Sequence, residues 1–168
     1  TGVTETDVET NGTLYNTLLV HDEHGSLVLK HRKLVPTNHE RLVWGQGDGA
    51  GLRAVPTSAG RIGGLICWEN YMPLARFALY ESGVEIYLAP TADDGETWQH
   101  SLVHIARESR AFVVSPAHFQ RASAYPPDFR SFLGLLAMQA AINAGALDAA
   151  RSYEAIVAES HPVRDEAA

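Results

Sequence analysis

Cysteine is nearly absent from this sequence, since Cys67 is the only one among 168 residues. A single thiol excludes an internal disulfide framework and is typical of the reducing cytoplasm, where we expect this protein to be located. Basic residues are also scarce: 13 lysines and arginines against 20 aspartates and glutamates leave a formal net charge of −7. The sequence therefore lacks the basic clusters that bind nucleic acid, and we expect no such partner.

Long hydrophobic runs are missing as well. No apolar segment approaches the roughly 20 residues that cross a bilayer, and no signal peptide is evident, so we expect no membrane partner. The chain begins at Thr1 without a methionine, which indicates either processing or a fragment of a longer protein. A hydrophobic content of 45% with 20% charged residues is ordinary for a globular protein, and this length can bury a core.

The first part of the chain has β-strand character. Two β-rich runs, Thr13–Val20 and Ser26–His31, flank the short polar sequence HDEHG and predict a β-hairpin. Val3 and Thr4 indicate the end of an earlier strand.

A glycine-rich and polar stretch, Pro36–Gly51, follows and is unsuited to a long regular element. Thr37 or Asn38 could cap one short helical turn there, with Glu40 near its start. The sequence GQGDG lacks the Lys-Ser/Thr that ends a phosphate-binding loop, so we interpret it as a turn.

The middle of the chain alternates between strand and helix patterns, which predicts a layered α/β core. Apolar Leu74, Phe77 and Ala78 recur at helical spacing in the first helix, as do Leu102, Ile105 and Ala106 in the second. After a short strand at Leu52–Pro56, the predicted elements are strand Arg61–Cys67, helix Met72–Ser82, strand Val84–Ala89, helix Thr97–Ser109 and strand Ala111–Pro116.

The last 40 residues have a different character. Phe132–Asn143 and Leu147–Glu159 are predicted to be helices that pair as an αα-hairpin. We therefore divide the chain into a domain of residues 1–128 and a helical C-terminal extension of residues 129–168.

Cys67 ends an apolar run in RIGGLICWENYMPLAR, directly before a sharp turn and a helix. A thiol at a helix start lies near backbone N–H groups that favour a thiolate, so we interpret Cys67 as a nucleophile. Trp68, Glu69 and Asn70 are poor core residues and suit the oxyanion or substrate-binding positions around a reacting carbon. The alternative is an inert, buried cysteine that acts as a small hydrophobe.

Lys33, in HRKLVPT, is the candidate cation of such a site. Its ammonium could favour the thiolate of Cys67 and stabilise negative charge on a substrate, although a lysine at a strand end is often only solvated. Either Glu40 or Glu69 could hold Lys33 or transfer protons, and spacing alone does not decide between them.

His100, His104 and Glu108 are spaced by four residues on one predicted helix, as in some metal sites. This pattern supports a rival hypothesis, a metal-dependent hydrolase. The HExxH form and a usual third ligand are lacking, so we expect no metal.

Three long segments resemble nitrilases of the carbon–nitrogen hydrolase superfamily, in the same order. RIGGLICWENYMPLAR resembles their catalytic-cysteine segment, KHRKLVPTNHERLVWGQGDG their catalytic-lysine segment, and TWQHSLVHIARESRAFVVSPAHF the helix and strand that follow. The resemblance covers about residues 2–128 and implies part of a four-layer α-β-β-α sandwich. The CWEN form looks closer to true nitrilases and cyanide-degrading relatives than to amidases.

The resemblance implies a role for four residues. Cys67 matches the nucleophile, Lys33 the catalytic lysine and Glu40 a second, supporting glutamate, while the N–H of Trp68 would contribute to the oxyanion site. The implied reaction converts a small nitrile to a carboxylic acid and ammonia through a thioimidate and a thioester, without a cofactor. Family members pair through helices, so a homo-oligomer is expected.

Two departures from the family pattern define the alternative. The family's first catalytic glutamate is not in this sequence, since Glu5 corresponds to a later position, and from about Phe129 the expected C-terminal strands are replaced by alanine-rich sequence. A non-catalytic oligomerisation or binding relic of the scaffold is therefore the second hypothesis. We expect the 168-residue chain to turn over nitriles poorly or not at all.

Overall fold

The structure is a computed structural model that describes residues 1–93 and 95–117. The predicted helices Phe132–Asn143 and Leu147–Glu159, and with them the predicted C-terminal extension, lie outside the described residues. In the described part, no helix is both long enough and apolar enough to cross a membrane.

The first sheet is antiparallel and has the order β1-β2-β3. Its strands are β1 (Gly2–Asp7), β2 (Thr13–His21) and β3 (Leu27–Arg32), so the predicted hairpin is confirmed. The Asp22 carboxylate accepts the N–H groups of His24 and Ser26, which closes the β2–β3 turn.

The chain after β3 forms one short 3-10 helix, η1 (Asn38–Leu42), with Thr37 as its N-cap, as predicted. The glycine-rich stretch beyond it does more than turn the chain. A Cβ atom at Gly47 would lie 2.3 Å from the carbonyl oxygen of Arg32, and one at Gly51 would lie 2.5 Å from the Cα of His31. Glycine is required at both positions because this segment packs backbone to backbone against the end of β3.

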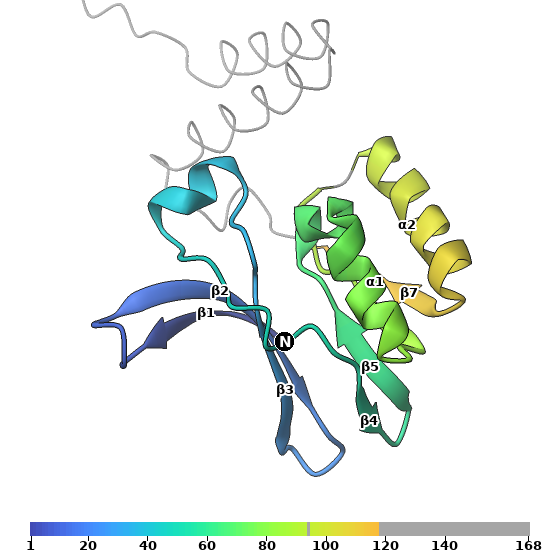
Figure 1. Cartoon of the computed structure of the whole chain (residues 1–168), viewed down its shortest axis with the longest axis horizontal. Coiled ribbons are helices and arrows are strands. Elements are labelled where there is room, and N and C mark those ends of the chain that lie inside the picture. Colours follow the sequence, from blue (N-terminus) through green and yellow to red (C-terminus); the bar gives the residue numbers. More distant parts are fainter. Residues whose placement is uncertain (94, 118–168) are drawn as a thin grey trace, which may run out of the picture. The chain divides into compact units, whose positions relative to one another are not determined.

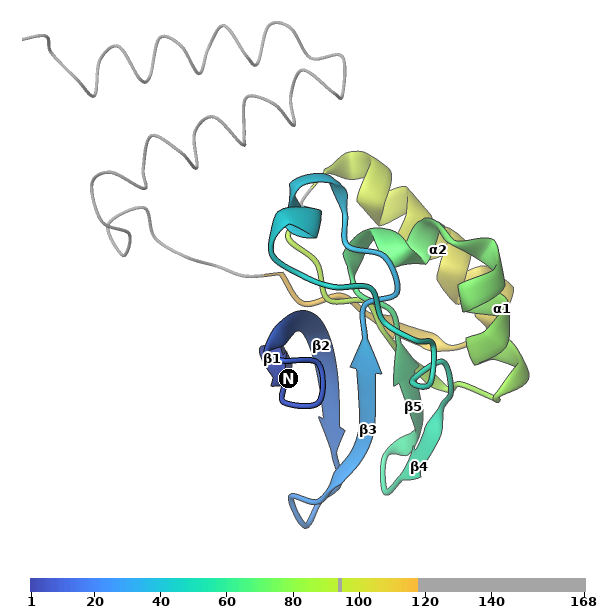
Figure 2. The ribbon, with the colours of Figure 1, turned by 60° about the vertical axis from the view of Figure 1, so that its left-hand side comes forward.

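The second sheet has the order β4-β5-β6-β7. β4 and β5 are antiparallel, whereas β5, β6 and β7 are parallel. Helices α1 (Pro73–Glu81) and α2 (Glu96–Ser109) connect the parallel strands and lie side by side over the same sheet (Figure 1 and Figure 2). The α/β fold is therefore confirmed; its strands here are β4 (Val55–Thr57), β5 (Gly60–Gly64), β6 (Ile86–Leu88) and β7 (Phe112–Val114).

The predicted strand Arg61–Cys67 was too long. β5 ends at Gly64. The N–H groups of Leu65 and Cys67 still donate to the carbonyls of Leu88 and Pro90, while the N–H of Ile66 between them donates to the Glu69 carboxylate at 2.6 Å. Cys67 consequently opens a 3-10 helix, η2 (Cys67–Tyr71), that leads directly into α1.

The apolar residues whose spacing predicted helix α1 are not those that the helix buries. Leu74 is 83% exposed and Phe77 is 58% exposed, whereas Ala75 and Leu79 are buried. Leu79 packs on Gly63 of β5, since a Cβ at Gly63 would lie 3.2 Å from its Cδ2 atom. The helix thus faces the sheet with one small and one large residue. On α2, Ile105 is buried and Leu102 packs against the core, as predicted.

Candidate active site

Cys67 lies in a strained turn where the chain leaves β5. Its φ angle of 54° is in the left-handed region that residues other than glycine rarely adopt. The Cys67 N–H donates to the carbonyl of Pro90 at 2.8 Å, and the side chain is partly exposed. The turn therefore presents the thiol at the carboxyl edge of the parallel strands, where substrates bind in many α/β proteins.

The Cys67 sulfur has one hydrogen-bond partner among the described residues, the hydroxyl of Thr91, at 3.2 Å. The Asp93 N–H donates to the same hydroxyl oxygen at 2.9 Å, which leaves the hydroxyl proton free to point at the sulfur. Thr91 belongs to no motif that is recognisable in the sequence. Its one signal was its position just after a parallel strand, at the same sheet edge as Cys67.

Lys33 is buried and paired with Glu40. Its Nζ donates to Glu40 Oε2 at 2.6 Å and to Thr37 Oγ1 at 3.0 Å, so the described residues accept two of its three N–H groups. The N–H of Thr37 donates to Glu40 Oε2 at 2.7 Å and fixes the carboxylate at the start of η1. Of the two glutamates considered for holding the lysine, the structure pairs Glu40 with it.

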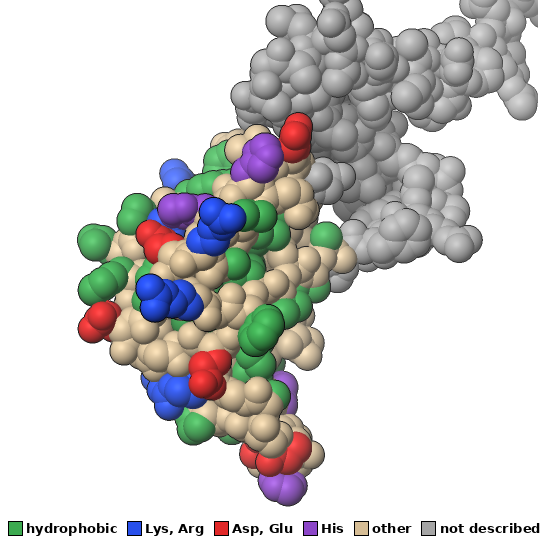
Figure 3. All heavy atoms as spheres, turned by 90° about the vertical axis from the view of Figure 1, so that its right-hand side faces the viewer, with side chains coloured by type: hydrophobic (Ala, Val, Ile, Leu, Met, Phe, Trp, Pro, Cys, Tyr) green, Lys and Arg blue, Asp and Glu red, His purple; other side chains and the backbone are tan. Residues whose placement is uncertain are grey.

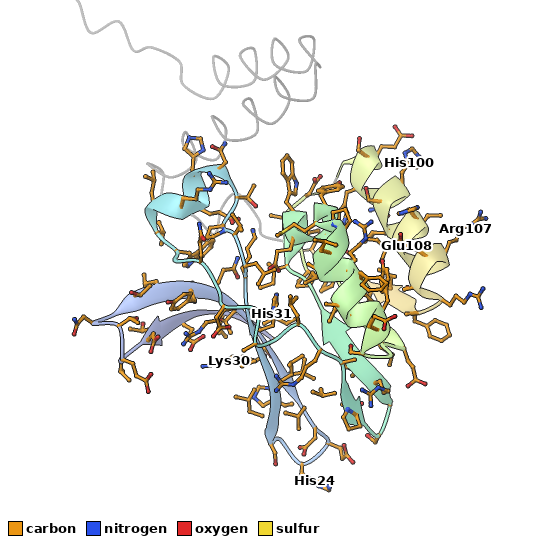
Figure 4. All side chains as sticks on the ribbon, in the orientation of Figure 1. His24, Lys30, His31, His100, Arg107 and Glu108 are labelled. Atoms are coloured by element: carbon orange, nitrogen blue, oxygen red, sulfur yellow. The ribbon has the colours of Figure 1, made fainter. Side chains whose placement is uncertain are left out.

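Glu69 has a fully buried side chain and binds three N–H donors from two parts of the fold. Leu34 N–H donates to Oε1 and Ile66 N–H donates to Oε2, both at 2.6 Å. The Nε2 atom of His31 lies 3.2 Å from Oε1 and 3.0 Å from Oε2. Figure 4 shows His31 on β3, on the side toward the second sheet.

This carboxylate brings the lysine and cysteine segments together. Leu34 directly follows Lys33, and Ile66 directly precedes Cys67. Because one side chain accepts both backbone N–H groups, the two segments meet at Glu69 although they come from different sheets.

The buried side chain of Asn70 stabilises the turn at Cys67. Its Nδ2 donates to the carbonyls of Cys67 at 2.7 Å and Leu65 at 3.0 Å. Its Oδ1 accepts the hydroxyl of Tyr87 at 2.8 Å, and burial raises the pKa of Tyr87, which keeps this hydroxyl protonated as a donor. The whole amide group of Asn70 is thus engaged within the fold.

Trp68 is the exposed residue of the segment. Its side chain is 52% exposed and its Nε1 donates to Asp93 Oδ2 at 3.2 Å. Its backbone N–H, at the start of η2, has no backbone acceptor within residues 1–93 and 95–117. Such an N–H is available to an anion next to the thiol.

The histidines of the rival hypothesis lie on α2. Figure 4 shows His100 and Glu108 on this helix, away from His31. Glu108 accepts the Tyr80 hydroxyl at 2.7 Å and Arg76 Nε at 3.2 Å, and these bonds lower its pKa. Among the described residues no group of three or more histidine, cysteine, aspartate and glutamate side chains suits a metal ion, so the geometry does not support a metal centre here.

The comparisons with known sequences agree with these features. A family model described as carbon-nitrogen hydrolase matches residues 1–151, which is further than the resemblance reached. A nitrilase from Bradyrhizobium diazoefficiens is 50% identical over 123 residues, covering 73% of this chain and 38% of its own length. A bifunctional nitrilase/nitrile hydratase of Nicotiana tabacum is 50% identical over 121 residues, covering 71% and 35%. The chain thus spans little more than a third of these relatives.

Solved structures share the fold. Nit3 of Saccharomyces cerevisiae, a member of branch 10 of the nitrilase superfamily, matches 71% of this chain and 44% of its own, with a TM-score of 0.63 and 23% identity. A carbon-nitrogen hydrolase from Helicobacter pylori G27 matches 68% and 43%, with a TM-score of 0.56 and 22% identity. Together with the matched family model, these findings show that the chain belongs to the carbon-nitrogen hydrolase family.

Proposed function

We propose that this chain carries most of a nitrilase-type site, in which Cys67 attacks a nitrile carbon. The observation that carries the proposal is the arrangement around the thiol: a strained, partly exposed cysteine with a hydroxyl donor on its sulfur. The segment of the buried Lys33–Glu40 pair is anchored to the cysteine segment through Glu69. The identity to nitrilases supports the choice of a nitrile as substrate.

The proposed reaction has two halves. The Cys67 thiolate forms a C–S bond to the nitrile carbon, and the nitrogen takes up a proton to give a thioimidate. Water adds to this carbon, ammonia leaves, and a thioester remains. A second water cleaves the C–S bond, which releases the carboxylic acid and regenerates the thiol. No cofactor enters these steps.

Each side chain of the site has a proposed task. The N–H group of Lys33 that the described residues do not use would bind the negative charge that develops on the substrate, with the N–H of Trp68 as a second donor. Glu40 holds the lysine. Asn70 and Glu69 support the turn and its neighbours from within the fold.

Glu5 is not proposed as the proton-transferring glutamate. Its carboxylate is occupied by Arg32, Lys30 and Thr17, and the hydrogen bond from Arg32 lowers its pKa from 4.5 to about 2. A carboxylate held in this way is a poor general base.

We also propose that the protein forms a homo-oligomer and acts in the cytoplasm on a small nitrile. Figure 3 shows apolar side chains among charged ones on the face that carries the helices. Leu74, Phe77 and Val103 on α1 and α2 are each more than half exposed, which suits contacts with a second copy. The location rests on the cysteine content of the sequence.

The test combines covalent labelling with turnover. Mass spectrometry of the chain after incubation with a reactive nitrile should show an adduct on Cys67, and Cys67→Ala should abolish it. Ammonia release from a panel of aliphatic and aromatic nitriles should be slow and insensitive to a chelator. Absence of any adduct, with self-association retained, would instead favour the non-catalytic scaffold; inhibition by the chelator would favour the metal hypothesis.

A further inference from the structure

Three N–H groups from different segments converge on one buried carboxylate, that of Glu69. The side chains of Glu69 and His31 are both fully buried. Within residues 1–93 and 95–117, no lysine or arginine forms an ion pair with Glu69. Burying a carboxylate without a cation is costly unless hydrogen-bond donors surround it. Loss of any of these three N–H groups would therefore raise the free-energy cost of burying the Glu69 carboxylate.

The hydrogen-bonding role of His31 follows from its second ring nitrogen, Nδ1. His31 Nδ1 is buried and has no hydrogen-bond partner in the described structure. If the ring were doubly protonated, an N–H group at Nδ1 would be buried without an acceptor. The arrangement therefore fits a neutral imidazole that donates its Nε2 proton to both oxygens of Glu69.

These contacts make Glu69 a link between the segment that carries Lys33 and the segment that carries Cys67. It is bound through Leu34 to the backbone beside Lys33, through Ile66 to the backbone beside Cys67, and through His31 to β3. With three internal donors on two oxygens and no exposure to solvent, the carboxylate is not placed to contact a substrate.

We propose that Glu69, with His31 behind it, is a positioning residue that sets the place of Lys33 relative to Cys67. This inference rests on the proposed function, because it assigns Glu69 a task within that site. From the sequence, Glu69 was expected to contact the substrate. In the present proposal it instead controls the relative position of Lys33 and Cys67. A displacement of either segment by about 1 Å would weaken the effect of the lysine on the thiol.

The experiment is a double-mutant cycle that reads the reactivity of Cys67. Because Cys67 is the only cysteine, the rate of alkylation by iodoacetamide reports on it alone. The four proteins are the unmodified chain, Lys33→Gln, Glu69→Gln and the double variant, each checked for folding by circular dichroism. Glu81→Gln, at an exposed position near the end of α1, replaces Glu69→Gln in a control cycle.

The expected result is a coupling between the two positions. Lys33→Gln should slow alkylation roughly tenfold in the unmodified chain, since a nearby positive charge favours the thiolate, and less than about threefold in the Glu69→Gln background. Equal effects in both backgrounds would overturn the proposal, as would no effect of Lys33→Gln in the unmodified chain. If Glu69→Gln does not fold, His31→Gln is used, with the same expectation.

The two proposals fail separately. Loss of nitrile labelling at Cys67 with the coupling intact would remove the nitrilase assignment and leave Glu69 as a positioning residue. Labelling without coupling would leave the cysteine chemistry standing and assign Glu69 to stability alone.

Discussion

Two short 3-10 helices, η1 and η2, use a glutamate in the same local way. In each, the residue before the helix donates its N–H to a glutamate three positions later, from Thr37 to Glu40 and from Ile66 to Glu69. The two carboxylates differ in everything else. Glu40 is 29% exposed and holds the ammonium of Lys33, whereas the fully buried Glu69 holds backbone N–H groups and a histidine.

The two carboxylates therefore differ in what they hold: Glu40 pairs with a charged side chain, and Glu69 accepts backbone and histidine N–H groups. Water can reach the partly exposed Glu40 carboxylate and bind an oxygen that loses a donor, which limits the cost on the carboxylate side. A buried carboxylate that loses donors leaves polar groups unpaired, which costs far more. This contrast agrees with the proposed roles, in which Glu40 holds Lys33 and Glu69 positions the two segments.

The largest expected effect distinguishes these two glutamates by stability. Glu69→Gln places an amide N–H₂ group against at least one backbone N–H, so we expect the free energy of unfolding to fall by about 3 kcal/mol. Glu40→Gln keeps an oxygen that can accept from Lys33 but removes the countercharge of that buried ammonium, so it should lower the free energy of unfolding by a smaller amount, about 1–2 kcal/mol. Urea unfolding of both variants measures the difference. Equal losses would show that burial does not separate the two sites.

A third glutamate, Glu5, tests the same comparison through pH. The hydrogen bond from Arg32 lowers the pKa of Glu5 from 4.5 to about 2, so its contribution to stability is present above pH 4.5 and is lost as the pH falls toward 2. Since Glu5 is partly exposed, solvent screening should keep this contribution below about 2 kcal/mol. Unfolding measured from pH 6 to pH 2.5 should show a shallower decline in Glu5→Gln than in the unmodified chain. Parallel curves would contradict this expectation.

A smaller loss of stability is expected when the hydrogen bond from Tyr87 to Asn70, a residue of η2, is removed. Tyr87→Phe removes the hydroxyl that donates to Asn70 Oδ1 and leaves a buried amide oxygen unpaired. We expect a loss of about 1–2 kcal/mol in the free energy of unfolding. Tyr80→Phe is the matched control, because its hydroxyl donates to the partly exposed Glu108, and it should cost less.

Local patterns in the sequence predicted much of the fold. The β2–β3 hairpin, the strand and helix alternation and the capped turn near Glu40 each depend on neighbouring residues. Periodicity predicted helix α1 but did not reveal which residues it buries, since the contact of Leu79 with Gly63 depends on the sheet. The apolar run also predicted that β5 would extend to Cys67, since the turn that begins with η2 at Cys67 leaves no mark in the hydrophobic pattern.

The proposed site was accessible from the sequence only in part. Cys67 and Lys33 were singled out from their own segments, whereas the contacts of His31 and Thr91 join distant positions. His31 lies 38 residues from Glu69, and Thr91 lies 24 residues from Cys67. No periodicity relates such pairs; only the topology, which places the ends of parallel strands at one edge, brings them together.

The last prediction concerns the Thr91 hydroxyl, which donates to the Cys67 sulfur and contacts neither Glu40 nor Glu69. Thr91→Val keeps the shape of the side chain but removes its donor to the Cys67 sulfur, so iodoacetamide should alkylate Cys67 about three- to tenfold more slowly. Thr91→Ser keeps the hydroxyl and should react within about twofold of the unmodified chain. If both variants slow the reaction equally, the methyl contact and not the hydrogen bond determines reactivity. A rate unchanged in Thr91→Val would mean that the geometry of the turn alone, held by Asn70 and Glu69, makes the cysteine reactive.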